Sequence, residues 1–402
     1  MSFGNRLSPV SNHGGQALGD TKDTATFKYF TYLELPRMGD KHRSLMKKHL
    51  SPELWERLKD IKSNKGYTLS NSIQTGVETP HLGVGITAGD EDCWEVFKEI
   101  LFPIIQGWHG FDPYTQTHQK DLDASKLTFS AAQKALFDKY VVSTRIRAAR
   151  NISGYGLPAG ATDADREDVK NLLVKAFAAF EGDLKGTYYP LQDMNDVLGN
   201  DLRSQGFLFQ VPKRTNLLTM AGAARNWPHA RGIYHNDDKT ALCWVNEEDH
   251  CRIISMAMKG DVKDVFARFA RISESLSAVA EAQGTKLMWS DTLGFLGTCP
   301  SNLGTGLRAS VMVVLPKLNE DVRLLEKICA SLDLQPRGSA GEHSAAVGGK
   351  WDVSNMQRIG FTEVQLVQKM IDGVGKLIAL EQKLERGQAI VPADYESPRA
   401  ML

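Results

Sequence analysis

The sequence predicts a protein of mixed α and β structure, with a small, mainly helical N-terminal part and a larger part in which strands and helices alternate. Helix signals dominate up to about residue 112, and the first clear strand pattern comes only at residues 140–147. Helical periodicity separates several of the later strand candidates. These candidates lie at residues 207–211, 217–220, 241–246 and 311–315. The length of 402 residues allows two or three domains, or one large α/β domain with a smaller one.

The N-terminal part begins with a polar, glycine-bearing stretch, residues 1–43, which we predict to be a flexible arm. Ser51 and Pro52 then have the pattern of a helix start, because serine caps the first turn and proline suits its first position. A loop over residues 75–88 with three glycines interrupts the helical pattern. We place the helical domain at residues 44–112 and a linker of low apolar density at 113–138.

The larger part, which we place at residues 139–392 before a tail at 393–402, opens with the strand of residues 140–147. Arg145 and Arg147 share one face of it, because side chains of a strand alternate. Apolar residues predict helices over 166–181, from Asp261 to Gly284, and from a capping box at Thr362 and Gln365 to Gly387. Residues 337–349 are small and polar, which predicts a mobile loop with a functional role.

The composition excludes several classes of protein. Lys+Arg and Asp+Glu both number 48, so net charge predicts no nucleic-acid or membrane partner. The five cysteines have no metal-ligand spacing, and their scatter favours reduced thiols in the cytoplasm. We find no stretch of about 20 apolar residues that would span a membrane. The first 25 residues also lack the features of a signal or transit peptide.

The stretch from Cys299 to Arg308, Cys-Pro-Ser-Asn-Leu-Gly-Thr-Gly-Leu-Arg, combines a thiol, glycines and a forked cation. Glycines allow backbone N–H groups to approach a ligand, and consecutive N–H groups in a turn can bind an anion. The two glycines loosely match a dinucleotide fingerprint, but that motif opens a helix and this one leads into a strand pattern. Gly348-Gly349-Lys350 is no P-loop, because Ser344 stands where its first glycine is required.

Arginines recur beside the predicted strands and loops, where they offer charge-assisted contacts to a triphosphate. An acidic run, Glu247-Glu248-Asp249, follows a strand candidate and is suited to a cationic acceptor. Surface exposure is the ordinary alternative for such residues. The arginines are Arg145, Arg147, Arg252, Arg308 and Arg337.

With these stretches the sequence resembles the phosphagen kinases, the ATP:guanidino phosphotransferases that include creatine and arginine kinases. The similarity extends over about residues 45 to 390 in the family's order. The matching stretches are Cys299–Arg308, residues 244–250, Arg145-Ile-Arg147, Asp90-Glu91, Trp227-Pro228 with residues 230–233, and residues 351–355.

The resemblance implies an α+β fold, with a small all-α N-terminal domain and a larger domain whose antiparallel β-sheet is flanked by α-helices. It assigns the five arginines to the phosphates of ATP and Asp352 to the nucleotide side. Glu248 would hold the guanidinium, and Glu342 would be a second carboxylate found in arginine- and lombricine-type members. Cys299 would be the reactive cysteine, and we expect nearby N–H groups and arginines to favour its thiolate.

The chemistry implied is reversible transfer of the γ-phosphoryl group for cellular energy buffering, which requires alignment and charge compensation rather than covalent catalysis. Mg²⁺ would arrive with ATP, because the sequence has no evident metal cage. Closure of residues 337–349 would exclude water from the reaction. The partners expected are ATP or ADP and a small guanidino compound, and a homodimer is compatible with the family.

The acceptor is predicted from three features. Residues 75–86 match the short form of the family's specificity loop, in which N–H groups of Thr75, Gly76 and Val77 would bind an acceptor carboxylate. Trp108 occupies a substrate-linked position but matches no known type. The short loop and Glu342 favour a long acceptor such as arginine, lombricine or taurocyamine over creatine.

Two departures from the family pattern concern the nucleotide. Gly206 and Met312 stand where histidines are usual, and methionine can still pack against an adenine ring. These departures motivate an alternative from another class, a non-catalytic relative that binds a nucleotide or a protein partner. Within the family, the alternative is a creatine kinase.

Overall fold

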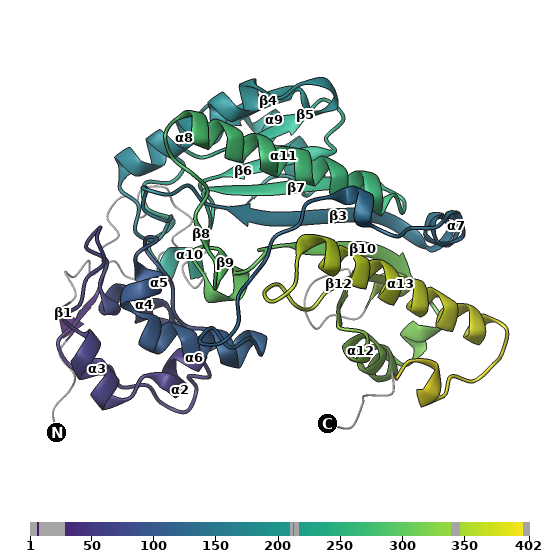
Figure 1. Ribbon diagram of the computed structural model, residues 1–402, viewed down its shortest axis with the longest axis horizontal. Coiled ribbons are helices and arrows are strands. Elements are labelled where there is room, and N and C mark those ends of the chain that lie inside the picture. The colour runs from purple at the N-terminus through teal and green to yellow at the C-terminus, as the bar shows by residue number, and fades with distance from the viewer. Residues whose placement is uncertain (1–5, 8–28, 210–211, 213–216, 339–345, 397–402) are drawn as a thin grey trace. The chain divides into compact units, whose positions relative to one another are not determined.

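The structure, a computed structural model, describes residues 6–7, 29–209, 212, 217–338 and 346–396. The chain divides into two compact units (Figure 1). The first unit comprises Met1–His118, Ala149–Ile253 and Glu274–Gly306, and the second comprises Gln119–Ala148, Ile254–Ser273 and Leu307–Leu402. Strands β3 (Val141–Arg150) and β7 (Cys251–Met258) and helix α11 (Val262–Ala282) each pass from one unit to the other.

The N-terminal part of the first unit is helical, as the sequence predicts. The predicted helix start is confirmed, because the Ser51 hydroxyl accepts a hydrogen bond from the backbone N–H of Leu54 at 3.2 Å. Thr68 and Asn71 form a reciprocal capping box on the next helix. The elements are β1 (Arg6–Leu7), β2 (Thr31–Tyr32), α2 (Leu45–His49), α3 (Pro52–Leu58), α4 (Leu69–Glu78), α5 (Cys93–Val96) and α6 (Lys98–His109).

The remainder of the first unit is built on strands in the order β7-β6-β5-β4. The pairs β4–β5 and β5–β6 are antiparallel, and every residue of β5 and β6 is buried, so apolar side chains cover both faces. On one face the ring of Phe177, from α8, stacks on Tyr234 of β5 with centroids 4.6 Å apart. The elements are α8 (Asp163–Ala178), β4 (Gly186–Pro190), α9 (Asp196–Ser204), α10 (Leu217–Met220), β5 (Gly232–Asn236), β6 (Ala241–Val245), β8 (Trp289–Ser290) and β9 (Gly294–Phe295), with single-turn 3₁₀ helices η2 (Gly182–Leu184), η3 (Leu191–Asp193) and η4 (Pro300–Asn302).

The second unit contains an antiparallel group of strands in the order β11-β12-β10-β3, with α13 lying along β10 and β12 (Figure 1). The predicted capping box of α13 is confirmed, since Thr362 and Gln365 bond each other's backbone, and Gly387 follows the helix with a φ of 72°. The elements are α7 (Ala131–Tyr140), β10 (Arg308–Val314), α12 (Val322–Ser331), β11 (Leu334–Gly338), β12 (Lys350–Asn355) and α13 (Glu363–Glu385), with 3₁₀ turns η1 (Ala124–Lys126), η5 (Leu318–Glu320), η6 (Val347–Gly349) and η7 (Pro392–Asp394).

Several predicted elements differ in the structure. Residues 217–220 were predicted as a strand but form α10, because a run of only four mostly apolar residues does not distinguish a strand from a helical turn. Residues 207–209 are not in a strand, and 210–211 lie outside the described residues. The turn η1 and most of helix α7 lie within the predicted linker, and α7 continues to Tyr140, the first residue of the predicted strand. Within the predicted arm, the Phe30 and Tyr32 N–H groups donate to side chains of α4.

The predicted mobile loop at residues 337–349 also differs. Arg337 belongs to β11, where it pairs in register with Asp352 of β12. Residues 347–349 form η6, and only residues 339–345 of the interval lie outside the description. Glu342, predicted as the second carboxylate, is among these and is not placed.

Candidate active site

The acidic run lies in a tight turn after β6. The Asn246 N–H donates to the His250 carbonyl at 2.9 Å, and the Asn246 side-chain amide donates to the carbonyls of Arg166 and Ala230, both at 2.9 Å. Asn246 has a φ of 55°, in the left-handed region that asparagine tolerates. The turn therefore holds the backbone of Glu247, Glu248 and Asp249 in one conformation.

Arg252, on β7, lies among these carboxylates. Its Nη1 is 2.8 Å from Glu247 Oε2, its Nη2 is paired with Glu248, and its Nε is 3.6 Å from Asp249 Oδ2. Burial alone would lower the pKa of the guanidinium, but the three carboxylates outweigh it and raise that pKa. The structure thus joins Arg252, predicted to bind phosphate, with Glu248, predicted to bind the guanidinium.

Glu248 is also bonded to the Cys299 segment. The Thr298 hydroxyl donates to the Glu248 carbonyl at 2.6 Å, and the Asn302 amide donates to Glu248 Oε1 at 3.1 Å. Cys299 lies between these two residues, with its Sγ 3.1 Å from the Ser301 hydroxyl. The structure therefore brings together the predicted carboxylate and the predicted thiol.

The prediction that the surroundings of Cys299 favour its thiolate is wrong for this structure. The pKa of the thiol is raised to about 11, mainly by burial and also by the neighbouring Glu248 charge, while hydrogen bonds with Ser301 oppose the rise. The Cys299 side chain is only 4% exposed, so solvation of a thiolate is lost. At neutral pH Cys299 is a neutral thiol.

The glycine turn after Cys299 is not a free anion-binding nest, contrary to the sequence prediction. The Gly304 N–H donates to the Leu293 carbonyl at 2.8 Å, and the Gly306 N–H donates to Leu303 at 3.2 Å. Both glycines have a positive φ, 76° and 59°, which favours glycine at these positions. Arg150 also holds the turn, because its Nη1 donates a hydrogen bond to the Thr305 carbonyl at 2.9 Å.

The predicted acceptor loop differs from its expected form. Thr75, Gly76 and Val77 lie in the last turns of α4 and are buried. In an α-helix their N–H groups donate to carbonyls four residues earlier, so they are not available to an acceptor carboxylate.

The rest of that segment, residues 79–88, reaches the Cys299 side of the site. The Ala88 N–H donates to the Thr298 carbonyl at 2.8 Å. Trp108, at 48% exposure, lies against Gly83, where an added Cβ would be 2.9 Å from the indole ring. The neighbouring His109 is 2.8 Å from the Pro300 carbonyl. Trp108 is therefore an accessible aromatic group beside the loop, and the residue after it, His109, contacts the Cys299 segment.

The second unit collects the other predicted phosphate ligands on one face of its strands. Arg147 pairs in register with Arg308, Arg145 pairs with Ser310, and Met312 pairs with both Ser143 and Asp352. Because side chains alternate along a strand, positions two residues apart share a face. One sheet face therefore carries Arg145, Arg147, Arg308, Arg337 and Asp352.

Asp352 and Ser354 contact one of the arginines on this face. Arg308 Nη2 donates to Asp352 at 2.8 Å and its Nε donates to the Ser354 hydroxyl at 3.2 Å. Burial lowers the pKa of the Arg145 guanidinium, and the attraction of Asp352 opposes this. The buried Nε of Arg145 has no hydrogen-bond partner among the residues that the structure describes. A face with an unsatisfied buried donor and four guanidinium groups is suited to a polyanion.

Ser354, Thr298 and Asn302 were not predicted as site residues. Asn302 lies inside the matching stretch, Thr298 precedes it, and Ser354 lies two residues after Asp352 on the same strand. The alternation of side chains along a strand could have indicated that Ser354 lies on the same face as Asp352. Nothing local indicated that Thr298 and Asn302 would bond to Glu248, about 50 residues earlier.

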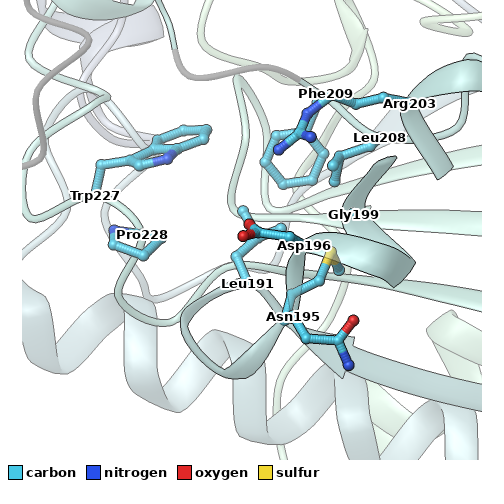
Figure 2. Close-up of a pocket in the computed structure, with 10 residues that line it drawn as sticks. Leu191, Asn195, Asp196, Gly199, Arg203, Leu208, Phe209, Trp227 and Pro228 are labelled. Carbon is cyan, nitrogen blue, oxygen red and sulfur yellow. The ribbon is translucent and has the colours of Figure 1, made fainter. Parts of the chain in front are cut away.

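A pocket of about 500 Å³ lies elsewhere in the first unit, between α9 and the segment of Trp227 and Pro228 (Figure 2). Trp227 and Phe209 form its aromatic wall with rings at 90°, and Asp196 and Arg203 contribute charge. It contains none of the predicted site residues.

The described residues contain no group of three histidine, cysteine, aspartate or glutamate side chains arranged to hold a metal ion. That Mg²⁺ binds together with ATP stays a prediction. No helix in the described part of the chain is long and apolar enough to cross a membrane.

Comparison with known families decides the identity of the chain. Residues 40–106 match ATP:guanido phosphotransferase, N-terminal domain, and residues 168–384 match ATP:guanido phosphotransferase, C-terminal catalytic domain. The chain belongs to the phosphagen kinases. It is an enzyme of the class that transfers phosphate to guanidino groups, and its α+β fold agrees with that family.

Individual relatives of this phosphagen kinase differ in their acceptors. Creatine kinase M-type of Gallus gallus is 44% identical over 374 residues, 92% of this chain and 97% of the relative. The crystal structure of a lombricine kinase has a TM-score of 0.84 and 42% identity, and covers 89% of this chain and 96% of that chain. The substrate-free duplicated taurocyamine kinase from Schistosoma mansoni has a TM-score of 0.80 and 34% identity, and covers 87% of this chain and 48% of that chain.

Proposed function

We propose that this phosphagen kinase transfers the γ-phosphoryl group of Mg-ATP reversibly to an extended guanidino acceptor, such as arginine, lombricine or taurocyamine, for energy buffering. The observation that carries most weight is the arginine face of the second unit, with its unsatisfied Arg145 Nε. Such a face supports binding of the phosphates of ATP, because guanidinium groups compensate the charge of the transferring group.

The guanidinium of the acceptor would bind at Glu248. Asn302 donates to its carboxylate and Thr298 donates to its backbone carbonyl, so Glu248 can orient a planar cation without first being ordered. Cys299, as a neutral thiol, would contact the same group at close range. That Arg252 binds phosphate stays a prediction.

The long acceptor is supported by the short loop and by Trp108. The half-exposed indole lies against Gly83 of the loop, next in sequence to His109, which contacts the Pro300 carbonyl. There it would contact the part of the acceptor beyond its guanidinium. The helical position of Thr75, Gly76 and Val77 speaks against carboxylate binding by their N–H groups. Arginine therefore has no advantage from that interaction over lombricine or taurocyamine.

A creatine kinase is the second candidate, because one relative with 44% identity is a creatine kinase. The family assignment speaks against the third alternative, a non-catalytic relative, which Gly206 and Met312 motivate. Gly206 follows α9 with a φ of 71°, which glycine adopts readily, and Met312 lies beside Asp352 in register. A location in the cytoplasm stays a prediction.

The activity itself is tested by ³¹P NMR of the purified protein with Mg-ATP and each guanidino compound in turn. We expect the resonance of an N-phosphorylated guanidine to appear, and ATP to form when that product is mixed with Mg-ADP. Absence of both signals with every acceptor would refute phosphotransfer and favour the non-catalytic alternative.

A further inference from the structure

Asn151 is a buried residue that connects the two segments of the guanidino side of the site. It follows the last residue of β3 and is 1% exposed. Its Oδ1 accepts the His250 backbone N–H at 2.7 Å, and its Nδ2 donates to Asp249 Oδ1 at 3.0 Å and to the Leu296 carbonyl at 2.9 Å. One amide is thus bonded to the turn that carries Glu248 and to the chain that leads to Cys299.

The contact continues through Asp249 to the Cys299 segment. Asp249 Oδ1 also accepts the Thr298 N–H at 3.3 Å, and a Cβ added at Gly297 would lie 2.9 Å from the same oxygen. Thr298 in turn donates to the Glu248 carbonyl. The Asn151–Asp249 pair therefore contacts both segments at once: the turn that carries Glu248, and the chain that leads to Cys299.

Removing the Asn151 donor would be costly, because Asp249 is fully buried. Burial raises the pKa of its carboxyl group, and Arg252 and the Asn151 hydrogen bond oppose that rise. A buried carboxylate that loses a donor moves or takes up a proton rather than remain unsatisfied. Either response would shift the turn that carries Glu248.

His250 anchors the other side of the same turn. Its Nδ1 accepts the Ile152 N–H at 3.0 Å, and its Nε2 donates to the Gly156 carbonyl at 2.8 Å. Ile152 is the residue after Asn151, so two consecutive residues bind the turn from the same strand end. The turn is therefore held by buried hydrogen bonds from the residues that follow β3, as well as by its own Asn246.

We propose that Asn151 is a positioning residue for phosphoryl transfer, whose side-chain amide fixes the spacing between Glu248 and Cys299. The proposal rests on the proposed role of Glu248 in binding the acceptor guanidinium. Phosphoryl transfer depends on alignment of the attacking nitrogen, and a displacement of about 1 Å can cost about a hundredfold in rate.

The test uses Asn151→Asp, which keeps the acceptor for His250 but removes the donor to Asp249 and Leu296. At pH 8 we expect kcat to fall about 10- to 100-fold, with the KM for Mg-ATP changed less than about twofold. In the protein without substrates, alkylation of Cys299 by iodoacetamide, followed on its own peptide by mass spectrometry, should become several-fold faster. That second readout does not depend on turnover.

Asn236→Asp is the matched control. Asn236 is also 1% exposed in a tight turn of the same unit, and its amide also donates twice, to the Asp183 carbonyl at 2.8 Å and to Thr240 at 2.9 Å. This variant should lose about as much thermal stability as Asn151→Asp does. Its kcat and its rate of Cys299 alkylation should stay near the wild-type values. An equal loss of kcat in both variants would mean that Asn151 is merely structural, and would overturn the proposal.

The double variant Asn151→Asp with Asp249→Asn exchanges the two side chains, so that one amide donor again faces one carboxylate acceptor. It also provides the test if the single variant Asn151→Asp does not fold. We expect at least tenfold recovery of kcat over the single variant, or wild-type-like Cys299 alkylation where the single variant is insoluble. Wild-type kcat and alkylation in Asn151→Asp would overturn the proposal. If the wild-type protein turns over no acceptor while alkylation still responds to Asn151→Asp, the spacing role stands and the proposed function fails.

Discussion

Arg252 and Glu248 form an ion pair in the first unit, although they are predicted to bind different substrates. Glu247 contacts the same guanidinium at 2.8 Å, so Arg252 keeps a partner when Glu248 turns to an acceptor. Arg308 and Asp352 are paired in the same way in the second unit. In each unit a residue predicted to bind a substrate is paired with a protein group of opposite charge, and the proposed binding would exchange that partner for the substrate.

Replacing Glu248 by glutamine removes the charge that would orient the acceptor and keeps the side-chain shape. We expect kcat to fall at least about a hundredfold, on the order of other lost transition-state contacts, with the melting temperature little changed. Glu247→Gln is the control, because Glu247 contacts Arg252 but not Asn302, and its loss should be at least tenfold smaller. Near-normal turnover of Glu248→Gln would mean that another carboxylate binds the acceptor.

Replacing Arg308 by alanine removes one guanidinium from the arginine face. We expect the loss mainly in kcat, by about 10²–10³, or roughly 3–4 kcal/mol of transition-state stabilisation. Arg323, an exposed arginine on α12 of the same unit, provides the control variant Arg323→Ala. Steady-state kinetics with varied Mg-ATP separates the effect on kcat from the effect on the KM for Mg-ATP. An unchanged kcat would mean that Arg308 does not belong to the phosphate site.

Replacing Trp108 by alanine tests the predicted acceptor side. Because the indole is half-exposed and touches Gly83, its loss should raise the KM for the acceptor several-fold while the KM for Mg-ATP stays constant. Tyr114→Ala is a suitable control, since Tyr114 is an exposed aromatic residue after the same helix. Equal changes in both KM values would contradict a role in acceptor binding.

The reactivity of Cys299 should depend on pH in a defined direction. With its pKa near 11 against an ordinary value of 9.0, about 1% of Cys299 is thiolate at pH 9, compared with half of a free thiol. The alkylation rate should therefore keep rising beyond pH 9, where that of a free thiol begins to level off. Since the thiol form is favoured by folding, its contribution to stability is lost as pH rises above about 9.

Glu248→Gln should lower the pKa of Cys299, because the carboxylate is one of the causes that raise it. Alkylation of the variant at pH 8 should be faster than that of the wild-type protein. A rate profile that levels off near pH 9 in both proteins would show that Cys299 is solvated rather than buried.

Local signals in the sequence predicted much of the fold. The helix starts at Ser51 and Thr362 were predicted because a cap and its partner lie within three residues of each other. The strand with Arg145 and Arg147 was predicted because a strand alternates its faces. The helix at residues 217–220 was not predicted, because an apolar run of this length is too short to show helical or strand periodicity.

The site was predicted as a set of residues but not as a set of contacts. The Arg252–Glu248 pair and the neutral state of Cys299 depend on burial, which no motif reports. Asn151 lies 98 residues from Asp249, and its role follows from the fold that brings the two together. The helical state of Thr75, Gly76 and Val77 was missed because glycines suggested a loop where Gly76 instead allows close contact with Gly85.

The acceptor preference tests the central claim most directly. The measurement is kcat/KM for creatine beside arginine, lombricine and taurocyamine, in a coupled assay at saturating Mg-ATP and constant pH. The account predicts that at least one of the three extended acceptors exceeds creatine by tenfold or more. A clear preference for creatine would contradict the argument from the short loop and Trp108, and the protein would be a creatine kinase.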